Sequence, residues 1–568
     1  MSEDNGHHGE KVIEEIRSLA IPPGWARASV GEIGDVRLGR QRSPKNRSAD
    51  FPTKYVRAAN ITWTGLDLSD VLDMEFRPGE LTSYRLQPGD VLLSEASGSA
   101  SEVGKPAIWN GELEDCCFQN TVIRFRPRAV SSKFALVAFQ HFARNSIFAR
   151  VSKGVGIHHL SADRFSSMPF LLPPKEEQGR IVAKIEELFS DLDAGVTALK
   201  RAKANLKRYR AVVLRAAVEG RLTEEWRVEA ASRRLPACQN ARQNHLSKAK
   251  PGTRQDAAST YEPASTLLAR ILTERRQKWE ADQLAKFAAA GKEPPKNWKE
   301  KYVEPSPPVT TGLPELPADW CWASVQQVGS VQLGRQRAPQ NHTGPHMRPY
   351  LRVANVFEDR IDLSDVMEMN FTPQEYETFR LSYGDILLNE GQSMELVGRP
   401  AMYRDEMPGV CFTNSLVRFR VYGGVNTEFA LKAFLAYLKN GRFQKIATIT
   451  VNIAHLGAGR FSEIEFPLPP VEEQAAIIEE VDRHFSLIDA AEKAISLSLA
   501  RAYRLRQSVL KQAFEGNLVP QDPTDEPASA LLERLKVEAA SRRLPSDKRQ
   551  KRQDAASTSG VRKRRAKS

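Results

Sequence analysis

The sequence contains few cysteines and no long apolar run. Only five of its 568 residues are cysteine, and none forms a CxxC pair or lies near histidines at zinc-finger spacing. Neither a disulfide framework nor a zinc site is therefore expected, which fits a reducing compartment. No apolar stretch approaches the roughly 18 residues of a membrane span, and residues 1–15 lack the hydrophobic core of a signal peptide. We expect a cytoplasmic protein that does not associate with membranes.

The loops that bind nucleotides and cofactors are also missing. There is no GxxxxGK[ST] motif, no GxGxxG between a strand and a helix, and no Asn-Pro-Pro-aromatic tetrad of the kind that amino-methylating enzymes use. His158, His159 and His455 precede a leucine in a loop, a position more typical of a structural than of a catalytic histidine. No nucleophile, base and orienting group occur at a readable spacing. The sequence indicates a binding protein, not an enzyme, with no cofactor or metal of its own.

The positive charge is unevenly distributed. Lys and Arg exceed Asp and Glu by 12 over the whole chain, and residues 546–568 alone hold nine Lys or Arg against two Asp. This tail is expected to be disordered. The rest of the chain is only mildly basic, so charge by itself is a weak argument for a nucleic-acid partner.

The most informative feature present is a stretch that occurs twice, at residues 172–222 and 468–518. Each copy begins with Leu-Pro-Pro, two glutamates and a glutamine, which predicts a helix start because proline and carboxylates suit the first turn. Each ends with Glu-Gly, where glycine can adopt a left-handed C-cap. Apolar residues recur at every seventh position between these signals, as in helices that wrap around another helix.

Both copies keep the same heptad phase, so we expect the two long helices to pair with each other. A second line of the seam is expected three residues after the first, at Leu188, Gly195, Ala202, Tyr209 and Ala216. The residues assigned to the interface are Ile185, Leu188, Leu192, Leu199, Leu206, Val213, Val481, Ile488, Ile495 and Val509.

Each long helix follows a globular segment, and the two segments, residues 21–171 and 313–467, resemble each other. Identical motifs recur at a shift of 295 residues, including LGRQR and GD followed by apolar residues. Short alternating runs separated by Gly, Pro and Asn predict strands and turns, with one helical stretch per copy at 133–150 and 428–446. We expect two α+β domains with mostly antiparallel strands.

The remaining segments connect these repeats. Residues 1–20 form a short lead, 223–312 a largely mobile linker that contains a helix at 262–285, and 519–568 a C-terminal helix with the basic tail. The linker helix either packs against the long helices or is merely solvated, since the pattern fits both. Two polar segments, VEAASRRLP and RQDAAST, occur in the linker and recur with identical sequence in the C-terminal segment.

The candidate binding surface is the turn LGRQRSPKNR at 38–47 and its copy LGRQRAPQNH at 333–342. Arg, Gln and Asn make bidentate contacts with guanine and adenine edges, and Lys and Arg neutralise phosphates; a solvated surface turn is the alternative. The loops after each GD strand, 94–104 and 389–398, form a second candidate. The residues assigned to DNA binding are Arg40, Gln41, Arg42, Lys45, Asn46, Arg47, Asn60, Ser94, Ser97, Ser99, Arg335, Gln336, Arg337, Gln340, Asn341, His342, Asn355, Asn389, Gln392 and Ser393.

The chain resembles the specificity subunits of type I restriction-modification systems, the HsdS family. The resemblance rests on the duplicated FLLPPKEEQ and FPLPPVEEQ exits, the GDVLL and GDILL strands, and the KYVRAANI and PYLRVANV strands. It implies two target-recognition domains spaced by an antiparallel coiled coil, each domain reading one half of a bipartite DNA target. It also implies two methylation subunits that bind S-adenosylmethionine and methylate adenine, and restriction subunits that use ATP and magnesium.

Two other interpretations remain open on the sequence. A methyltransferase or nuclease with diverged motifs would modify or cleave DNA without partners. A coiled-coil scaffold whose paired domains bind protein would show no sequence-dependent retention of DNA.

Overall fold

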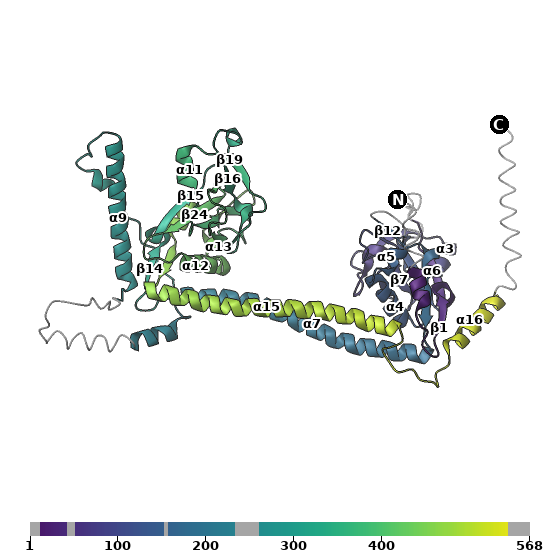
Figure 1. Ribbon diagram of the computed structural model, residues 1–568. Helices are drawn as coiled ribbons and strands as arrows, with labels where there is room; N and C mark the ends of the chain where they lie inside the picture. The colour runs from purple at the N-terminus through teal and green to yellow at the C-terminus, as the bar shows by residue number, and fades with distance from the viewer. Residues whose placement is uncertain (1–11, 42–51, 153–156, 233–260, 543–568) are drawn as a thin grey trace, which may run out of the picture. The chain divides into compact units, whose positions relative to one another are not determined.

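The computed structural model describes residues 12–41, 52–152, 157–232 and 261–542 (Figure 1). The chain forms two compact units, one comprising Met1–Lys200 with Ser496–Ser568 and the other Arg201–Ile495. Each unit contains one α+β domain and part of both long helices. The linker residues 233–260 and the tail residues 543–568, whose mobility the sequence predicts, lie outside the described part of the chain.

A four-stranded antiparallel sheet, in the order β2-β11-β7-β9, forms the centre of the first domain. The GD motif precedes its strand β7, and the buried Asp90 accepts hydrogen bonds from the Gln87 amide and from both Nε and Nη2 of Arg126. The strands of this domain are β1 (Ala26–Ser29), β2 (Gly34–Leu38), β3 (Pro52–Val56), β4 (Ile61–Thr62), β5 (Gly65–Leu66), β6 (Leu72–Glu75), β7 (Val91–Ser94), β8 (Ala96–Ser97), β9 (Pro106–Ile108), β10 (Cys117–Phe118), β11 (Val122–Pro127), β12 (His158–His159) and β13 (Pro169–Leu172).

The second domain repeats this arrangement with the sheet β15-β24-β20-β22. Asp385 is fully buried before β20 and binds Arg420 as Asp90 binds Arg126. Its strands are β14 (Cys321–Ser324), β15 (Gly329–Leu333), β16 (Met347–Leu351), β17 (Val356–Phe357), β18 (Arg360–Ile361), β19 (Met367–Asn370), β20 (Ile386–Asn389), β21 (Gly391–Gln392), β22 (Pro400–Met402), β23 (Cys411–Phe412), β24 (Leu416–Val421), β25 (Thr448–Thr450), β26 (Ile453–His455) and β27 (Glu465–Leu468).

The expected mostly antiparallel strand pairing is confirmed. Each domain adds a three-stranded sheet, β10-β3-β6 or β19-β16-β23, in which one pair is parallel. A smaller antiparallel pair joins the first strand to the last, β1 to β13 and β14 to β27. This pairing brings the start of each domain next to the beginning of its long helix.

Each predicted helical stretch inside the domains is in fact two helices. The first contains α4 (Ser132–Arg144) and α5 (Ile147–Val151), and the second contains α12 (Thr427–Asn440) and α13 (Arg442–Ile446). The break falls at Ser146 (φ +56°) and at Gly441 (φ +79°), because a left-handed residue cannot continue a right-handed helix. The longer helix packs against the central sheet, as α12 does beside β24 in Figure 1.

Short helices lie at the edges of the domains. They are α2 (Val30–Ile33), α3 (Pro78–Tyr84) and α6 (Ala162–Ser167) in the first domain, and α10 (Val325–Val328), α11 (Pro373–Phe379) and α14 (Ala458–Glu463) in the second.

A buried glutamine joins each domain to its long helix. Gln178 accepts a hydrogen bond from the Ser131 amide and donates to the carbonyl oxygens of Ala129 and Pro173. Gln474 makes the same set of bonds with Asn426, Gly424 and Pro469. The glutamine of the duplicated helix start therefore contacts the N-terminus of α4 or α12 as well as its own helix.

The two long helices, α7 (Lys175–Val218) and α15 (Val471–Phe514), have 44 residues each. At 1.5 Å per residue each is about 66 Å long. Gly220 (φ +71°) and Gly516 (φ +73°) adopt the left-handed conformation after the last turn, as the Glu-Gly endings predict.

The helices pair antiparallel through the same contacts in each unit. In the first unit, Arg506 binds Asp193 at 2.8 Å and lies 4.2 Å from the ring centroid of Phe189. In the second unit, Arg210 binds Asp489 and lies 4.5 Å from the ring centroid of Phe485. Each residue of one set is the copy, 296 positions away, of a residue in the other. The sequence prediction that these two helices are partners is confirmed.

The second line of the seam was predicted only in part. Gly195 and Tyr209, expected in the seam, are exposed, whereas Leu188, Ala202 and Ala216 are partly buried. In a heptad, position a is followed by d three residues later, and d by the next a four residues later. The positions four residues after the first line are covered throughout the second copy and at all but Lys203 in the first, so the second line lies mainly four residues on.

The predicted interface residues themselves are covered. Ile185, Val213, Val481, Ile488 and Val509 are buried. Leu188, Leu192, Leu199, Leu206 and Ile495 are partly buried.

The helices that follow α7 and α15 pack into the units. In the linker helix α9 (Ala264–Ala289), Ala264, Leu267 and Ile271 join the core that contains the end of α7. In α16 (Ala528–Arg542), Ala528 and Leu532 join the core that contains the end of α15. The base of the linker helix is therefore packed, while its remaining turns are largely exposed.

Two equivalent glutamates have different environments. Glu473 is buried and accepts hydrogen bonds from Trp320 Nε1 (2.8 Å), Thr223 Oγ1 (2.7 Å) and Arg227 Nη1 (2.5 Å). Glu177 is equally buried, but neither carboxylate oxygen has a hydrogen-bond partner among the described residues. Burial raises the pKa of Glu177, and the nearby Trp25 and Arg180 counteract this only in part.

This difference predicts opposite effects of two matched substitutions. Glu473→Ala removes the carboxylate to which a buried indole, a buried threonine hydroxyl and the partly buried Arg227 donate, and should destabilise the second unit by about 3 kcal/mol. Glu177→Gln should stabilise the first unit at neutral pH, because its raised pKa means that ionisation opposes folding there. The gain should vanish in acid, below the unfolded pKa, where the carboxyl is protonated in both states. Hydrogen exchange of the first turns of α7 and α15 at both pH values measures each effect, and equal protection changes in the two variants would contradict the assignment.

Candidate nucleic-acid interface

The GRQR turns follow the edge strands β2 and β15 of the two central sheets. A Cβ on Gly39 or Gly334 would lie 2.2 Å from the carbonyl oxygen of Gln119 or Thr413, so only glycine fits there. The next residue, Arg40 or Arg335, forms a parallel bridge with the same neighbouring segment. The backbone of each turn is thus fixed before its polar side chains leave the sheet.

The first arginine of each turn is bound inside its own domain. Arg335 donates to Glu375 Oε1 (2.8 Å) and to the Asn370 carbonyl (2.9 Å), and its guanidinium lies 5.0 Å from the Phe371 ring centroid. Burial tends to raise the pKa of Glu375, but hydrogen bonds from Arg335 and Thr372 outweigh it and hold the pKa below its ordinary value. These bonds leave Arg335 little freedom to contact a base.

Arg40 has the matching set of partners in the first domain. It binds Glu80 Oε1 (3.0 Å) and the Glu75 carbonyl (2.7 Å) and lies 5.3 Å from the Phe76 ring centroid. On the sequence, the presence of GRQR in both copies favours a binding role. At the first arginine of the motif, the structure gives another reason for the identity, because Arg40 and Arg335 form equivalent ion pairs within their own domains.

Other side chains of the turns remain available. In the second domain Gln336, Arg337, Gln340 and His342 are exposed, Asn341 is partly buried, and Arg337 lies 5.7 Å from the Tyr350 ring centroid. Gln41 is exposed in the first domain. The predicted residues Arg42, Lys45, Asn46 and Arg47 lie outside the described residues. The available donors and acceptors are the types that read base edges.

Two asparagines assigned to DNA binding have their side chains buried in turns. Asn60, in a short 3₁₀ turn (Ala58–Asn60), accepts from the Arg57 amide and donates to the carbonyls of Asp67 and Asp70. Asn355 makes the equivalent bonds with Arg352, Asp362 and Asp365. A base contact would require these turns to open.

The loops after the GD strands begin with a buried residue that differs between copies. Ser94 donates to the Glu102 carbonyl and accepts from the Lys105 amide. Asn389 is fully buried, and neither end of its amide has a hydrogen-bond partner among the described residues. Farther along, Ser99 and Ser393 are exposed, while Ser97 and Gln392 are partly exposed in the short strands β8 and β21.

The ion pairs beneath these loops were not found from the sequence. In the first domain Glu102 accepts hydrogen bonds from Trp63 Nε1 (2.7 Å) and Lys105 Nζ (2.6 Å). The guanidinium of Arg144 lies 4.1 Å from the Trp63 ring centroid. In the second domain Leu396 stands at the place of Glu102, and Arg399 lies 4.8 Å from the Phe357 ring centroid. Residue-by-residue comparison of the two copies would have identified these positions, because they differ within an otherwise matching frame.

The histidines of the loops are paired with glutamates. His159 lies 3.2 Å from Glu95 and His455 lies 3.0 Å from Glu390, each pair linking the loop after the GD strand to the strand that precedes α6 or α14. This arrangement supports the structural interpretation of these histidines.

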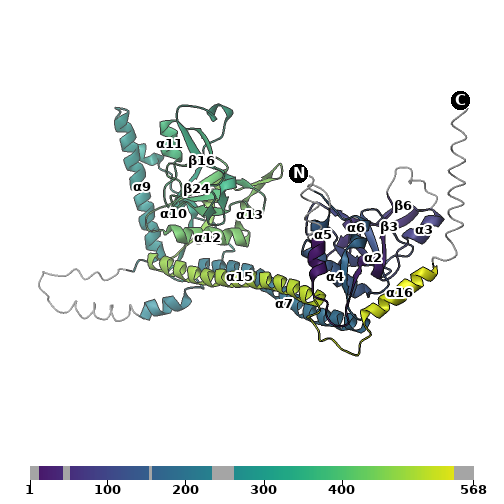
Figure 2. The same ribbon diagram turned by 45° about the vertical axis from the view of Figure 1, so that its right-hand side comes forward.

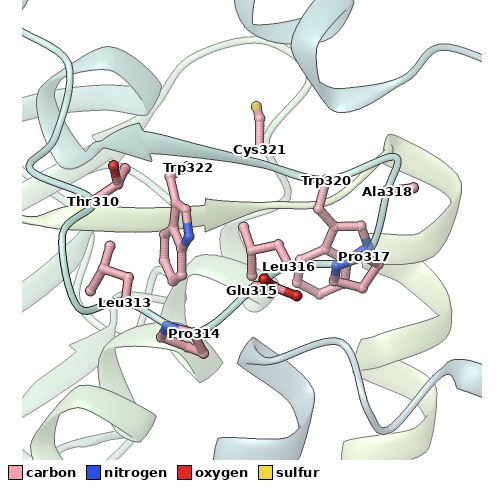
Figure 3. Close-up of a pocket in the computed structure, with 10 residues that line it drawn as sticks. All are labelled: Thr310, Leu313, Pro314, Glu315, Leu316, Pro317, Ala318, Trp320, Cys321 and Trp322. Atoms are coloured by element: carbon pink, nitrogen blue, oxygen red, sulfur yellow. The ribbon is translucent and has the colours of Figure 1, made fainter.

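An open pocket of about 440 Å³ lies at the entrance to the second domain, and Figure 3 shows the side chains that line it. Trp320, Trp322 and Leu316 line it together with the carboxylate Glu315, while the thiol of Cys321 points away from them. Burial raises the pKa of Cys321 to about 11, so this thiol is protonated at neutral pH.

In the described ranges, no three His, Cys, Asp or Glu side chains are grouped to hold a metal ion. Within those ranges, no helix combines the length and apolar character that crossing a membrane requires.

Two copies of one α+β domain, each followed by a long helix that pairs antiparallel with the other, define a class of duplicated recognition proteins. The family model described as "Type I restriction modification DNA specificity domain" matches residues 22–204 and again 327–500. The chain therefore belongs to this family.

Individual proteins of this kind match along nearly the whole chain. The type I restriction enzyme EcoKI specificity subunit of Escherichia coli K12 is 24% identical over 542 residues, covering 92% of this chain and 96% of that protein. The StySPI specificity subunit of Salmonella potsdam is 24% identical over 541 residues with the same coverage. A solved structure from a study of type I R-M complex assembly and conformational transition has the same fold, with a TM-score of 0.56 and 16% identity over 88% of this chain and all of that one.

The two kinds of turn residue predict separable effects. Arg335→Ala should lower the stability of the second domain by about 1.5–3 kcal/mol, because charged hydrogen bonds to Glu375 and Asn370 are lost. Gln336→Ala and Arg337→Ala, at exposed positions, should change stability by less than about 0.5 kcal/mol and should weaken DNA retention instead. Urea unfolding and DNA binding of the three variants distinguish a residue that stabilises the domain from one that contacts DNA. Unchanged stability of Arg335→Ala would refute its stabilising role.

Proposed function

We propose that this chain is the DNA-specificity subunit of a type I restriction-modification complex. Each α+β domain binds one half of a bipartite target in double-stranded DNA. The observation that carries the proposal is the duplication of a whole domain, with exposed polar side chains on a fixed turn in each copy. The family match to both copies and the coverage of two specificity subunits support it.

The paired helices would act as the spacer between the two half-sites. Their 44-residue lengths, their shared heptad phase and the repeated Arg–Asp pairs suit a stiff rod. The length of the helices would then set the number of base pairs between the half-sites, and no side chain would contact those bases specifically.

The chemistry would reside in partner subunits. Apolar side chains outside the seam of the long helices are exposed, including Val212 (56%), Leu487 (60%) and Leu505 (51%), and such positions suit contacts with two methylation subunits. S-adenosylmethionine would bind to those subunits, and ATP and magnesium to restriction subunits that join them. In this proposal the chain is not an enzyme, binds no cofactor, and works in the cytoplasm, where its DNA substrate is.

Mapping methylated adenines in a strain with the gene and its neighbours intact, and again after deletion of this gene, tests the function. A bipartite methylated motif should be lost on deletion and restored by the intact gene. Because the two domains are alike, its halves should be related as near-inverted repeats. Replacement of residues 313–467 with the corresponding domain of another specificity subunit should change one half only. A methylome that does not respond to the deletion would refute the proposal.

Shortening both helices tests the spacer. Removal of residues 196–202 and 495–501, one heptad from each helix at matching positions of the antiparallel register, shortens the rod by about 10 Å. At 3.4 Å per base pair, the preferred spacer should lose about three base pairs, while the bases of both half-sites stay the same. Methylome mapping of the double deletion gives the answer, and an unchanged spacer would contradict this role.

A further inference from the structure

A β-hairpin in the second domain carries an apolar tip. Strands β25 and β26 pair with Thr450 opposite Ile453, which leaves Val451 and Asn452 as a two-residue turn. Both have positive φ, +48° and +67°, as a type I′ turn requires. The hairpin projects from the domain beside α13 (Figure 2).

Valine at the tip opposes the stability of this turn. Type I′ turns favour Asn, Asp and Gly, and a β-branched residue in the left-handed region is strained. Asn452 suits its position, but Val451 does not, and its side chain is 89% exposed and so packs on little of the protein. Ile449 and Ile453, on the two strands below it, are also exposed. Neither turn geometry nor packing against the described residues explains a valine at this position.

The base of the hairpin is held firmly. Arg460 donates to the carbonyls of Ile446 and His455 and to Thr448 Oγ1, which ties both strands to the helix α14. Strand β21 adds a third strand on the other side of β26, and its neighbour Glu390 binds His455. The tip is thus presented on a rigid support next to Gln392, one of the residues assigned to DNA binding.

The first copy has the same tripeptide pattern in its sequence. Val155-Gly156-Ile157 aligns with Val451-Asn452-Ile453, and each is followed by a histidine just before a leucine. Glycine and asparagine are the two residues that best tolerate positive φ. Val155 and Gly156 lie outside the described residues.

The surroundings of the tip favour DNA as the contacting partner. Lys445 and Arg460 are exposed at its base, and Glu390, which precedes β21, is paired with His455. A two-stranded β-ribbon fits the major groove, where the apolar feature of the bases is the 5-methyl group of thymine. We propose that Val451, flanked by Ile449 and Ile453, contacts a thymine methyl in the half-site read by the second domain. This proposal rests on the proposed function.

The test replaces thymine with uracil, which removes only the methyl group. The full chain is assembled with its methylation subunits and titrated with duplexes that carry the methylome-defined target. Uracil at the critical thymine of the second domain's half-site should weaken binding of the wild-type complex about four-fold, as expected for one buried methyl. Uracil in the first domain's half-site should produce a loss that does not depend on residue 451.

Val451→Gly is the decisive variant, since glycine removes the side chain and also relieves the positive-φ strain. Its complex should bind thymine DNA about four-fold more weakly than wild type and should lose nothing further with uracil. Val451→Asn should behave in the same way and shows whether the effect depends on the flexibility of glycine. Val309→Gly, at a valine that is 79% exposed away from the hairpin, is the matched control and should bind as wild type does.

The outcomes separate this proposal from the function on which it rests. A Val451→Gly complex that still distinguishes thymine from uracil, or that loses affinity equally for both, overturns the thymine contact while leaving the proposed function intact. A half-site without thymine on either strand overturns it as well. A wild-type complex with no sequence-dependent affinity for any duplex refutes the proposed function, and the thymine contact with it. Thermal unfolding should show Val451→Gly to be at least as stable as wild type.

Discussion

The hydrogen bonds of one buried glutamine in each repeat decide how domain and helix are joined. Gln178 and Gln474 each bind two carbonyl oxygens and one amide, from both their own helix start and the segment that leads into α4 or α12. All of these partners are main-chain groups, so the junction does not depend on the side chains of the recognition loops. A domain can therefore change its exposed residues without changing its attachment to the long helix.

The antiparallel pairing of the long helices α7 and α15 also uses one set of contacts twice. Arg506, Asp193 and Phe189 have their copies in Arg210, Asp489 and Phe485, so one set of residues serves both units. The copies are not interchangeable everywhere. Glu473 is satisfied by Thr223 and Arg227, whereas Val519 occupies the place of Thr223 in the first unit and leaves Glu177 without that partner.

Periodicity and duplication predicted most of the architecture. The heptads gave the helix partners, and the GD and LGRQR motifs gave two matching α+β domains, because backbone periodicity and turn residues act locally. The second line of the seam was predicted only in part, since an apolar series every seven residues fits position a or d equally well until the partner is seen. The breaks at Ser146 and Gly441 were missed because a single left-handed residue leaves the apolar helical pattern almost unchanged.

The binding surface was harder to predict because the residues that hold the turns in place and the residues that could contact DNA are of the same types. Arg335 and Arg337 lie two positions apart in one turn, yet one is bound to Glu375 and the other is exposed. Asn355 resembles a base reader in sequence, but all of its hydrogen-bonding capacity toward the turn is used by three main-chain groups. The two roles differ only in whether the side chain has a hydrogen-bond partner within the domain. That partner is distant in the sequence, as Glu375 is from Arg335.

Some residues that are the same in both copies, such as Arg40 with Arg335 and Asn60 with Asn355, are bound within their own domains. Identity between two domains that read separate half-sites is what a shared frame requires. Residues that differ, such as Glu102 and Leu396, lie beneath the loops, where a change alters the shape and charge offered to a partner. Agreement between the copies therefore does not by itself mark a recognition residue, because residues of the frame and exposed residues of the turn are both shared, and the loop after β20 is where the second domain can acquire a specificity of its own.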